Sequence, residues 1–168
     1  MKKRFENITE ITKDKIIRFN YFNLLNNKLL LILLLYMPVI WMVSGIGMFI
    51  KESDTRRLVI SILLTMVWLT LVFLPPYMSV KRKYKTKDYT NEYEFYEDKL
   101  VAKNKFASEE ILYSSLYKVY ETKRYFYFYI NKKNALIVEK DNFKNKSCVL
   151  FVKFIKTKLN KKYKKVEF

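Results

Sequence analysis

Two long uncharged stretches constrain this chain more than any other feature. The first, LLLILLLYMPVIWMVSGIGMFI, runs from Leu29 to Ile50, and the second, LVISILLTMVWLTLVFLPPYMSV, runs from Leu58 to Val80. As α-helices rising about 1.5 Å per residue, each is roughly 33 Å long, enough to cross a hydrocarbon core of about 30 Å. The alternatives are a buried soluble helix or a signal peptide, whose apolar region is only about 7–15 residues long. We therefore predict two transmembrane helices.

The short link between these stretches, KESDTRR from Lys51 to Arg57, forces the two helices into an antiparallel hairpin with both chain ends on one side. Basic residues are concentrated outside the link, and short flanking segments rich in Lys and Arg stay in the cytoplasm. We therefore expect a multi-pass protein of the cell membrane with both termini cytoplasmic. The single Cys148 fits a reducing compartment, because it has no partner in the chain for a disulfide.

A basic cluster directly follows the second stretch, and it consists of Lys81, Arg82, Lys83, Lys85 and Lys87. Each Lys or Arg near an anionic leaflet contributes about 1 kcal/mol of attraction. Contact with anionic lipid headgroups is therefore expected. The simpler interpretation is that the cluster only fixes the topology, as such clusters beside membrane helices commonly do.

Small and hydroxyl-bearing residues within the two stretches predict close helix packing. In the first stretch they are Ser44, Gly45 and Gly47, and they are expected to pack near Ser61 and Thr65 of the second. Trp41 and Trp68 lie well inside the stretches and are also expected to be packing residues. Pro75 and Pro76 are expected to loosen or end the second helix.

The first 28 residues read as a cytoplasmic arm. The segment RFENITEI alternates enough for a short strand, and Thr12 can cap a following helix with Asp14 in its first turn. We interpret this helix as lying at the membrane surface, with a disordered basic arm as the alternative.

After Lys87 the pattern becomes that of an antiparallel β-rich domain over residues 88–168. Aromatic and β-branched runs separated by turn residues predict six strands, at about 91–96, 99–106, 109–113, 116–122, 125–131 and 135–140. In the run YFYFYI, alternation places Tyr125, Tyr127 and Tyr129 on one face and phenylalanines on the other. We expect the phenylalanines to face the core and the tyrosine hydroxyls to reach water or a protein partner.

The last segment, SCVLFVKFIKTKLNKKYKK, reads as one amphipathic helix capped by Ser147. Its apolar stripe is Cys148, Val152, Ile155 and Leu159, joined by Phe151, at three- and four-residue steps. The predicted fold is therefore a membrane α-helical hairpin (residues 29–80) plus an α+β domain. That domain would be an antiparallel, pleckstrin-homology-like (PH-like) barrel or sheet capped by the C-terminal helix. A different sheet with a helix on one face is the competing arrangement.

The chain resembles the YcxB-like family of bacterial membrane proteins. The matching stretches are YEFYEDKLVAKNKF, ILYSSLYKVYETKRYFYFYINKKNALIVEKDNF and FVKFIKTKLNKKYKK, with family positions falling on Tyr113, Lys140 and Phe143. The resemblance implies an N-terminal arm, two transmembrane helices and a PH-like cytoplasmic domain. Many members carry proline where this chain has Glu139, so the exit from that strand is expected to differ. The family has no established activity, and the resemblance therefore implies no catalytic residue.

The residue inventory argues against an enzyme, a cofactor or a metal site. The chain contains no histidine and one cysteine, which removes the commonest general base and a zinc-ligand set. Both glycines, Gly45 and Gly47, lie in the first apolar stretch, so the rest of the chain has no glycine-rich phosphate loop. Basic neighbours and a helix start are expected to lower the pKa of Cys148, although a small buried cysteine is the commoner role.

Three functions remain compatible with the sequence. The first is a membrane-tethered module that binds a protein or anionic lipid through its cytoplasmic domain, where 23 Lys and Arg from Lys81 onward face 11 Asp and Glu. The second is an accessory subunit whose hairpin packs into a larger transporter or signalling complex. The third is nucleic-acid binding, suggested by the net charge of +17. We expect no nucleic-acid partner, because no recognition motif accompanies the charge.

Overall fold

The structure, a computed structural model, describes residues 2–53, 55–83, 89–144 and 148–167, and for residues 81–83 only the backbone. It divides into two compact units. Met1–Lys15 and Lys87–Phe168 form one, called here the β-rich unit, and Ile16–Thr86 form the other, called the helical unit. Helix α1 (Lys13–Asn26) starts in the first and continues in the second. The first residues of the expected arm thus belong to the same unit as the C-terminal half.

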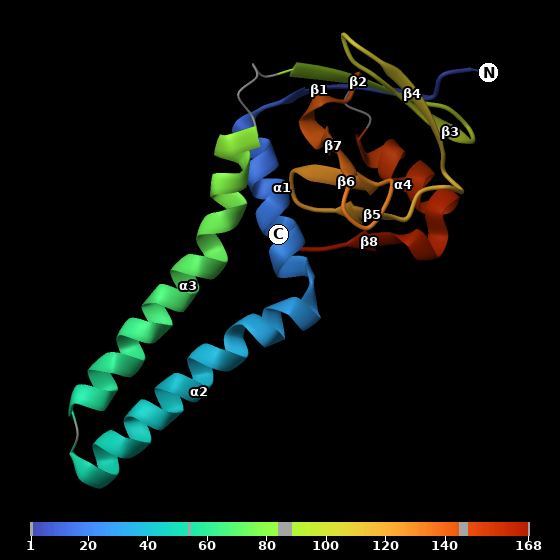
Figure 1. Ribbon diagram of the computed structural model, residues 1–168. Coiled ribbons are helices and arrows are strands. Elements are labelled where there is room, and N and C mark those ends of the chain that lie inside the picture. Colours follow the sequence, from blue (N-terminus) through green and yellow to red (C-terminus); the bar gives the residue numbers. More distant parts are fainter. Residues whose placement is uncertain (1, 54, 84–88, 145–147, 168) are drawn as a thin grey trace. The chain divides into compact units, whose positions relative to one another are not determined.

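The helical unit contains the predicted hairpin, formed by α2 (Lys28–Glu52) and α3 (Thr55–Lys83) (Figure 1). Asn27 caps α2, accepting a hydrogen bond from Leu30 N at 3.2 Å, and Ser53 ends it in the left-handed conformation, φ 52°. Both helices are long and apolar enough to cross a membrane. Pro75 and Pro76 were expected to loosen or end the second helix. They do not end it, because α3 continues to Lys83.

Helix α1 and the tryptophans support this hairpin. The Tyr21 hydroxyl donates to Phe73 O at 2.9 Å, and Asn20 Nδ2 donates to Pro76 O at 3.2 Å, so α1 side chains bond to backbone carbonyls beside the two prolines.

The two tryptophans pack between α2 and α3. Trp41 and Trp68 meet edge to face with ring centroids 5.8 Å apart, and Trp68 Nε1 donates to Leu34 O at 2.8 Å. Their predicted role as packing residues is confirmed.

The β-rich unit contains two four-stranded sheets. In the first, β1 (Phe5–Ile11), β2 (Tyr89–Phe95), β3 (Lys99–Lys103) and β4 (Ser108–Leu112) are antiparallel neighbours in that order. The short strand predicted in the arm therefore exists, and it is an edge strand of this sheet. Its register pairs Phe5 with Phe95 and Ile11 with Tyr89.

The second sheet has the order β7 (Ala135–Glu139), β6 (Tyr125–Tyr129), β5 (Lys118–Glu121), β8 (Tyr163–Lys165). Strands β5, β6 and β7 are antiparallel, whereas β8 runs parallel to β5. All six predicted C-terminal strands are present. Among the described residues neither sheet closes on itself, and the PH-like barrel is not confirmed.

The C-terminal helix, α4 (Cys148–Leu159), is shorter than predicted. The 3-10 turn Asn160–Lys162 follows it, and Asn160 has φ 42°. Asparagine tolerates this left-handed conformation better than most residues, so it ends the helix and turns the chain into β8. The expectation of one helix through Lys165 is therefore wrong. Ser147, the predicted cap, lies outside the described residues.

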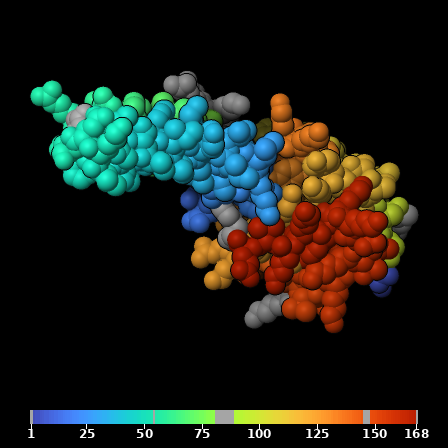
Figure 2. All heavy atoms as spheres, turned by 90° about the horizontal axis from the view of Figure 1, so that it is seen from below, coloured from blue at the N-terminus to red at the C-terminus, as the bar shows by residue number. Residues whose placement is uncertain are grey.

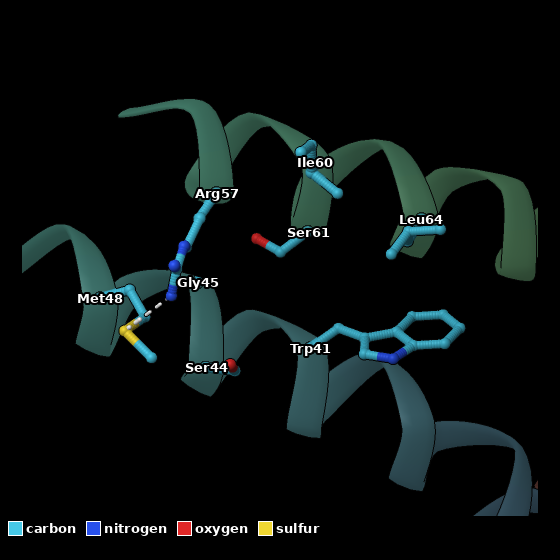
Figure 3. A pocket seen from close by; sticks show the side chains of 8 residues that line it. All are labelled: Trp41, Ser44, Gly45, Met48, Arg57, Ile60, Ser61 and Leu64. Carbon is cyan, nitrogen blue, oxygen red and sulfur yellow. Dashed lines mark hydrogen bonds between the residues drawn. The ribbon is translucent and has the colours of Figure 1, made fainter. Parts of the chain in front are cut away.

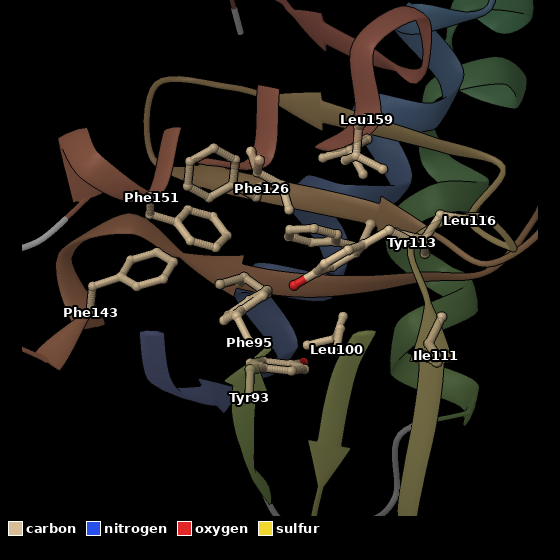
Figure 4. Packing of buried hydrophobic residues seen from close by; sticks show 14 residues of the cluster. Tyr93, Phe95, Leu100, Ile111, Tyr113, Leu116, Phe126, Phe143, Phe151 and Leu159 are labelled. Carbon is tan, nitrogen blue, oxygen red and sulfur yellow. The ribbon is translucent and has the colours of Figure 1, made fainter. Parts of the chain in front are cut away.

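The core of the β-rich unit lies against α4 and is largely aromatic (Figure 4). Phe151 of α4 is fully buried, with ring centroids 4.4 Å from Phe143, 4.6 Å from Phe95 and 5.3 Å from Phe126. Ile155 and Leu159, at the following four-residue steps, are buried with it. The stripe predicted from the helical period is thus the face that α4 buries.

Strand β1 is also bound to β7 by buried polar groups. Asn7 Nδ2 donates to Glu139 O at 2.7 Å, Glu139 N donates to Thr9 Oγ1 at 3.0 Å, and Thr9 Oγ1 donates to Asn7 Oδ1 at 2.6 Å. Asn7 and Thr9 are fully buried, and buried polar side chains need such partners. A proline at position 139 would lack the N–H that Thr9 accepts, so this hydrogen bond requires a residue other than proline at the strand exit.

Candidate functional site

The tyrosines of β6 do not form the exposed surface that the sequence suggested. Tyr125, Tyr127 and Tyr129 are 8%, 1% and 4% exposed. The stacked rings of Tyr125 and Tyr127 lie 6.1 Å apart, and the Tyr129 ring contacts Tyr120 edge to face at 5.5 Å. Strand β6 lies between β5 and β7, so each tyrosine ring has neighbours along and across the sheet. The three tyrosines share one face, as the alternation predicts, but the prediction that this face is an exposed partner surface is wrong.

A buried ionic group lies at the end of β5. Glu121 is 6% exposed, and its Oε1 accepts from Lys140 Nζ at 2.6 Å, while its Oε2 accepts a very short hydrogen bond from the Tyr163 hydroxyl. Lys140 Nζ also lies 5.0 Å from the centroid of the Phe126 ring. Both carboxylate oxygens are occupied within the protein. These contacts link β5 to β8 and to the turn after β7, so the group stabilises the fold.

Cys148 lies near this ionic group, and the pKa of its thiol shifts in the direction opposite to the expected lowering. Partial burial raises the pKa of the Cys148 thiol, while the positive charge of Lys140 acts in the other direction more weakly. A raised pKa keeps the thiol protonated, and the thiolate is the reactive form. The structure therefore gives Cys148 the character of a small packing residue.

The outer face of the first sheet carries a polar hollow of about 340 Å³. Lys103 Nζ lies 2.7 Å from Glu94 Oε2, and Lys99 Nζ lies 2.7 Å from Glu110 Oε2. The hydrogen bond from Lys103 lowers the pKa of the Glu94 carboxyl, and the same bond raises the pKa of Lys103. Because these four ionic side chains pair with one another, the hollow has little net charge with which to hold an ion.

The hairpin contains a second hollow, a cleft of about 220 Å³ between α2 and α3 (Figure 3). Trp41, Ser44, Gly45 and Met48 of α2 face Arg57, Ile60, Ser61 and Leu64 of α3 across it. Arg57 Nη1 donates to Met48 Sδ at 3.3 Å, so the cation lies over one end of the cleft.

The five residues predicted to pack between the helices do not all do so. Gly45 and Ser61 are buried against each other: a Cβ on Gly45 would lie 2.1 Å from Ser61 Oγ and 2.8 Å from Ser61 Cβ. Gly47 has nothing within 4 Å of such a Cβ, and Ser44 is exposed on the cleft rim. Thr65 is half-buried, and its Oγ1 has no hydrogen-bond partner among the described residues. The close approach of the helices thus depends on Gly45.

Replacing Gly45 by alanine is expected to destabilise the hairpin by about 1–3 kcal/mol, the usual cost of overpacking. The Ser61 hydroxyl can rotate away from the new methyl group, but Ser61 Cβ cannot, so the helices must separate. Detergent-induced unfolding of the full chain measures this, because both tryptophans of the protein lie in the hairpin and report on it by fluorescence.

The matched control for this substitution is Gly47→Ala, which is expected to cause no loss because space is open there. The double variant Gly45→Ala/Ser61→Gly removes the obstructing atoms and is expected to recover stability. Equal destabilisation by Gly45→Ala and Gly47→Ala would contradict the packing argument.

The structure does not describe the side chains of the basic cluster that follows the second apolar stretch. Lys85 and Lys87 lie outside the described residues, and Lys81, Arg82 and Lys83 are described only as backbone in the last turn of α3. Headgroup contact by this cluster stays a prediction. In the part of the chain that the structure describes, no group of three His, Cys, Asp or Glu side chains is placed to hold a metal ion.

The positions that carry the family resemblance have structural roles. The Tyr113 hydroxyl donates to Tyr96 O at 2.9 Å, Lys140 pairs with Glu121, and Phe143 is a buried core residue. Comparison with known families supports the resemblance itself. The family model described as YcxB-like protein matches residues 95–155, from the end of β2 into α4. No curated protein and no solved structure matches the chain. The resemblance is therefore confirmed, and residues 95–155 form a YcxB-like segment.

Proposed function

We propose that this chain is a membrane-anchored, non-catalytic module. In this proposal α2 and α3 cross the cell membrane as a hairpin, and the β-rich unit binds protein or anionic lipid at the cytoplasmic face. The activity would be one of binding and presentation, without a cofactor, a metal ion or a nucleic-acid partner.

The observation that supports the anchor is the outward direction of apolar side chains on α2 and α3. Ile50 is 76% exposed, Leu29 69%, Val43 66% and Leu71 64%. A soluble protein rarely exposes a contiguous apolar surface larger than a few hundred Å². A lipid environment removes the cost of this surface, because hydrocarbon tails are themselves apolar.

The composition of the β-rich unit supports a binding role over catalysis. The ionic side chains that line its polar hollow, and those of its buried pair, are already engaged with one another. The excess of positive charge from Lys81 onward, 23 basic against 11 acidic residues, favours an anionic partner.

The anchor is tested with the full-length chain expressed in cells. Alkaline carbonate should leave the protein in the membrane pellet, whereas detergent should extract it. A cytoplasm-active reporter should function when fused to either terminus, and an export-dependent reporter should stay inactive there. Carbonate release would remove the membrane hairpin from the proposal, and export-dependent activity would reverse its orientation.

A second candidate is an accessory membrane subunit that acts through the hairpin. The open cleft of about 220 Å³ with Arg57 over one end favours it, because side chains of a partner helix packed on the hairpin can enter such a cleft. Exchange of both helices for an unrelated hairpin separates the two functions. Partners trapped by crosslinking in cells should survive the exchange if the β-rich unit binds them, and should be lost if the hairpin does.

A further inference from the structure

Helix α4 has a second face that the core does not use. It buries Phe151, Ile155 and Leu159, whereas Val149 and Leu150 in its first turn are 71% and 61% exposed. Neither residue belongs to the stripe that the helical period predicted to be buried. In the space-filling view the C-terminal residues, drawn in red, form a continuous surface of the β-rich unit (Figure 2).

Lysines continue this exposed face along the helix. Lys153 and Lys156 follow Val149 at four and seven residues and are exposed, so they lie on the same side of α4 as Val149. We call Val149, Leu150, Lys153 and Lys156 the outer face of α4. It combines two adjacent apolar side chains with two cations and contains no acidic residue.

This combination matches a bilayer surface better than a protein surface. Single exposed apolar residues are ordinary, but two adjacent ones beside cations on one helix face resemble an interfacial amphipathic helix. Lysine is depleted in protein–protein interfaces, whereas at a membrane its stem lies along apolar groups while its ammonium reaches the phosphates. The lysines also favour an anionic leaflet over a neutral one.

We propose that the outer face of α4 docks on the anionic surface of the membrane, with Val149 and Leu150 inserted between headgroups and Lys153 and Lys156 contacting phosphates. This inference rests on the proposed membrane anchor, because the anchor keeps the β-rich unit at high local concentration beside one leaflet. It assigns lipid binding to the C-terminal helix, a site separate from the basic cluster after α3.

The single native cysteine makes a direct test possible. In a Cys148→Ser background of the full chain, Leu150→Cys is labelled with an environment-sensitive fluorophore and the protein is reconstituted into nanodiscs. Nanodiscs of phosphatidylglycerol and phosphatidylethanolamine are compared with nanodiscs of phosphatidylcholine. The expected result is a blue-shifted probe, quenched by spin-labelled lipid, in the anionic nanodiscs only.

Two variants sharpen the test. Ser108→Cys, exposed on β4, is the matched control and should remain in water in both lipids. Lys153→Gln/Lys156→Gln should weaken docking about 25-fold, at about fivefold for each lysine. Both lysines are exposed, and the contact of Lys156 Nζ with the Tyr163 ring, 5.3 Å from its centroid, is a weak one at an exposed site, so their replacement should leave the fold intact.

The outcomes separate the docking from the anchor. A chain that fails to incorporate into nanodiscs contradicts the anchor. A chain that incorporates while the probe at position 150 stays in water contradicts the docking alone. A probe that is shielded without quenching by labelled lipid indicates a protein partner and also contradicts it, as does equal quenching at position 108.

Discussion

Replacing Phe151 by alanine is expected to lower the free energy of unfolding of the β-rich unit by about 3–5 kcal/mol, as for other buried phenylalanines. Phe151 is fully buried at the centre of the aromatic core, with Phe143, Phe95, Phe126 and Phe5 around it at centroid distances of 4.4–5.4 Å. Because these rings come from β1, β2, β6, the segment after β7 and α4, none can collapse into the cavity alone. Hydrogen exchange of β6 amides in the full chain measures the loss.

The chain offers a matched control for this substitution. Phe106 is 91% exposed in the turn between β3 and β4, where Asn104 Oδ1 accepts from the backbone N–H groups of Phe106 and Ala107. Phe106→Ala leaves these bonds in place and should change stability by no more than about 0.5 kcal/mol. Similar effects of the two substitutions would show that the core is not organised around Phe151.

Replacing Glu121 by glutamine is expected to destabilise the β-rich unit by about 3–5 kcal/mol, since it leaves the Lys140 ammonium without its counter-charge in a buried site. The side chains of Glu121 and Lys140 are 7% and 15% exposed, and their charged atoms lie 2.6 Å apart. The substitution also weakens the hydrogen bond from Tyr163, which links β8 to β5. Urea titration with hydrogen exchange at β5 and β8 measures both consequences.

An exposed ion pair in the same unit provides the comparison. Glu110 is 64% exposed and pairs with Lys99, so Glu110→Gln should cost at most about 1 kcal/mol. Replacing both buried partners, as Glu121→Leu/Lys140→Met, should recover most of the stability, because it leaves no unpaired charge. If Glu121→Gln and Glu110→Gln lower the free energy of unfolding equally, the buried ion pair stabilises the unit no more than the exposed pair does.

Local patterns were enough to predict most elements of this fold. The hairpin follows from two uncharged stretches joined by a short link, and its limits differ from the prediction by only a few residues. The C-terminal strands follow from alternation and turn residues, and α4 buries the stripe that its period indicated. The close approach at Gly45 was also predicted, because only small residues allow it. In each case the signal lies within a few consecutive residues.

Features that depend on contacts between distant segments were not predictable in this way. Alternation showed that Tyr125, Tyr127 and Tyr129 share a face, but it could not show that this face is buried. The left-handed Asn160 ends α4 where the lysine-rich sequence suggested that it continues, and the following residues pair with β5.

The sequence by itself determined the apolar hairpin, strands β1 to β7 and the inner face of α4, because each follows from the order of neighbouring side chains. The tertiary structure decided that β1 pairs with β2, although the sequence of the entire hairpin separates the two strands. It also decided that β8 runs parallel to β5 and that, among the described residues, neither sheet closes. Strand pairing joins backbone groups that all residues share, so its partners are selected by the packing of the complete core rather than by any local pattern.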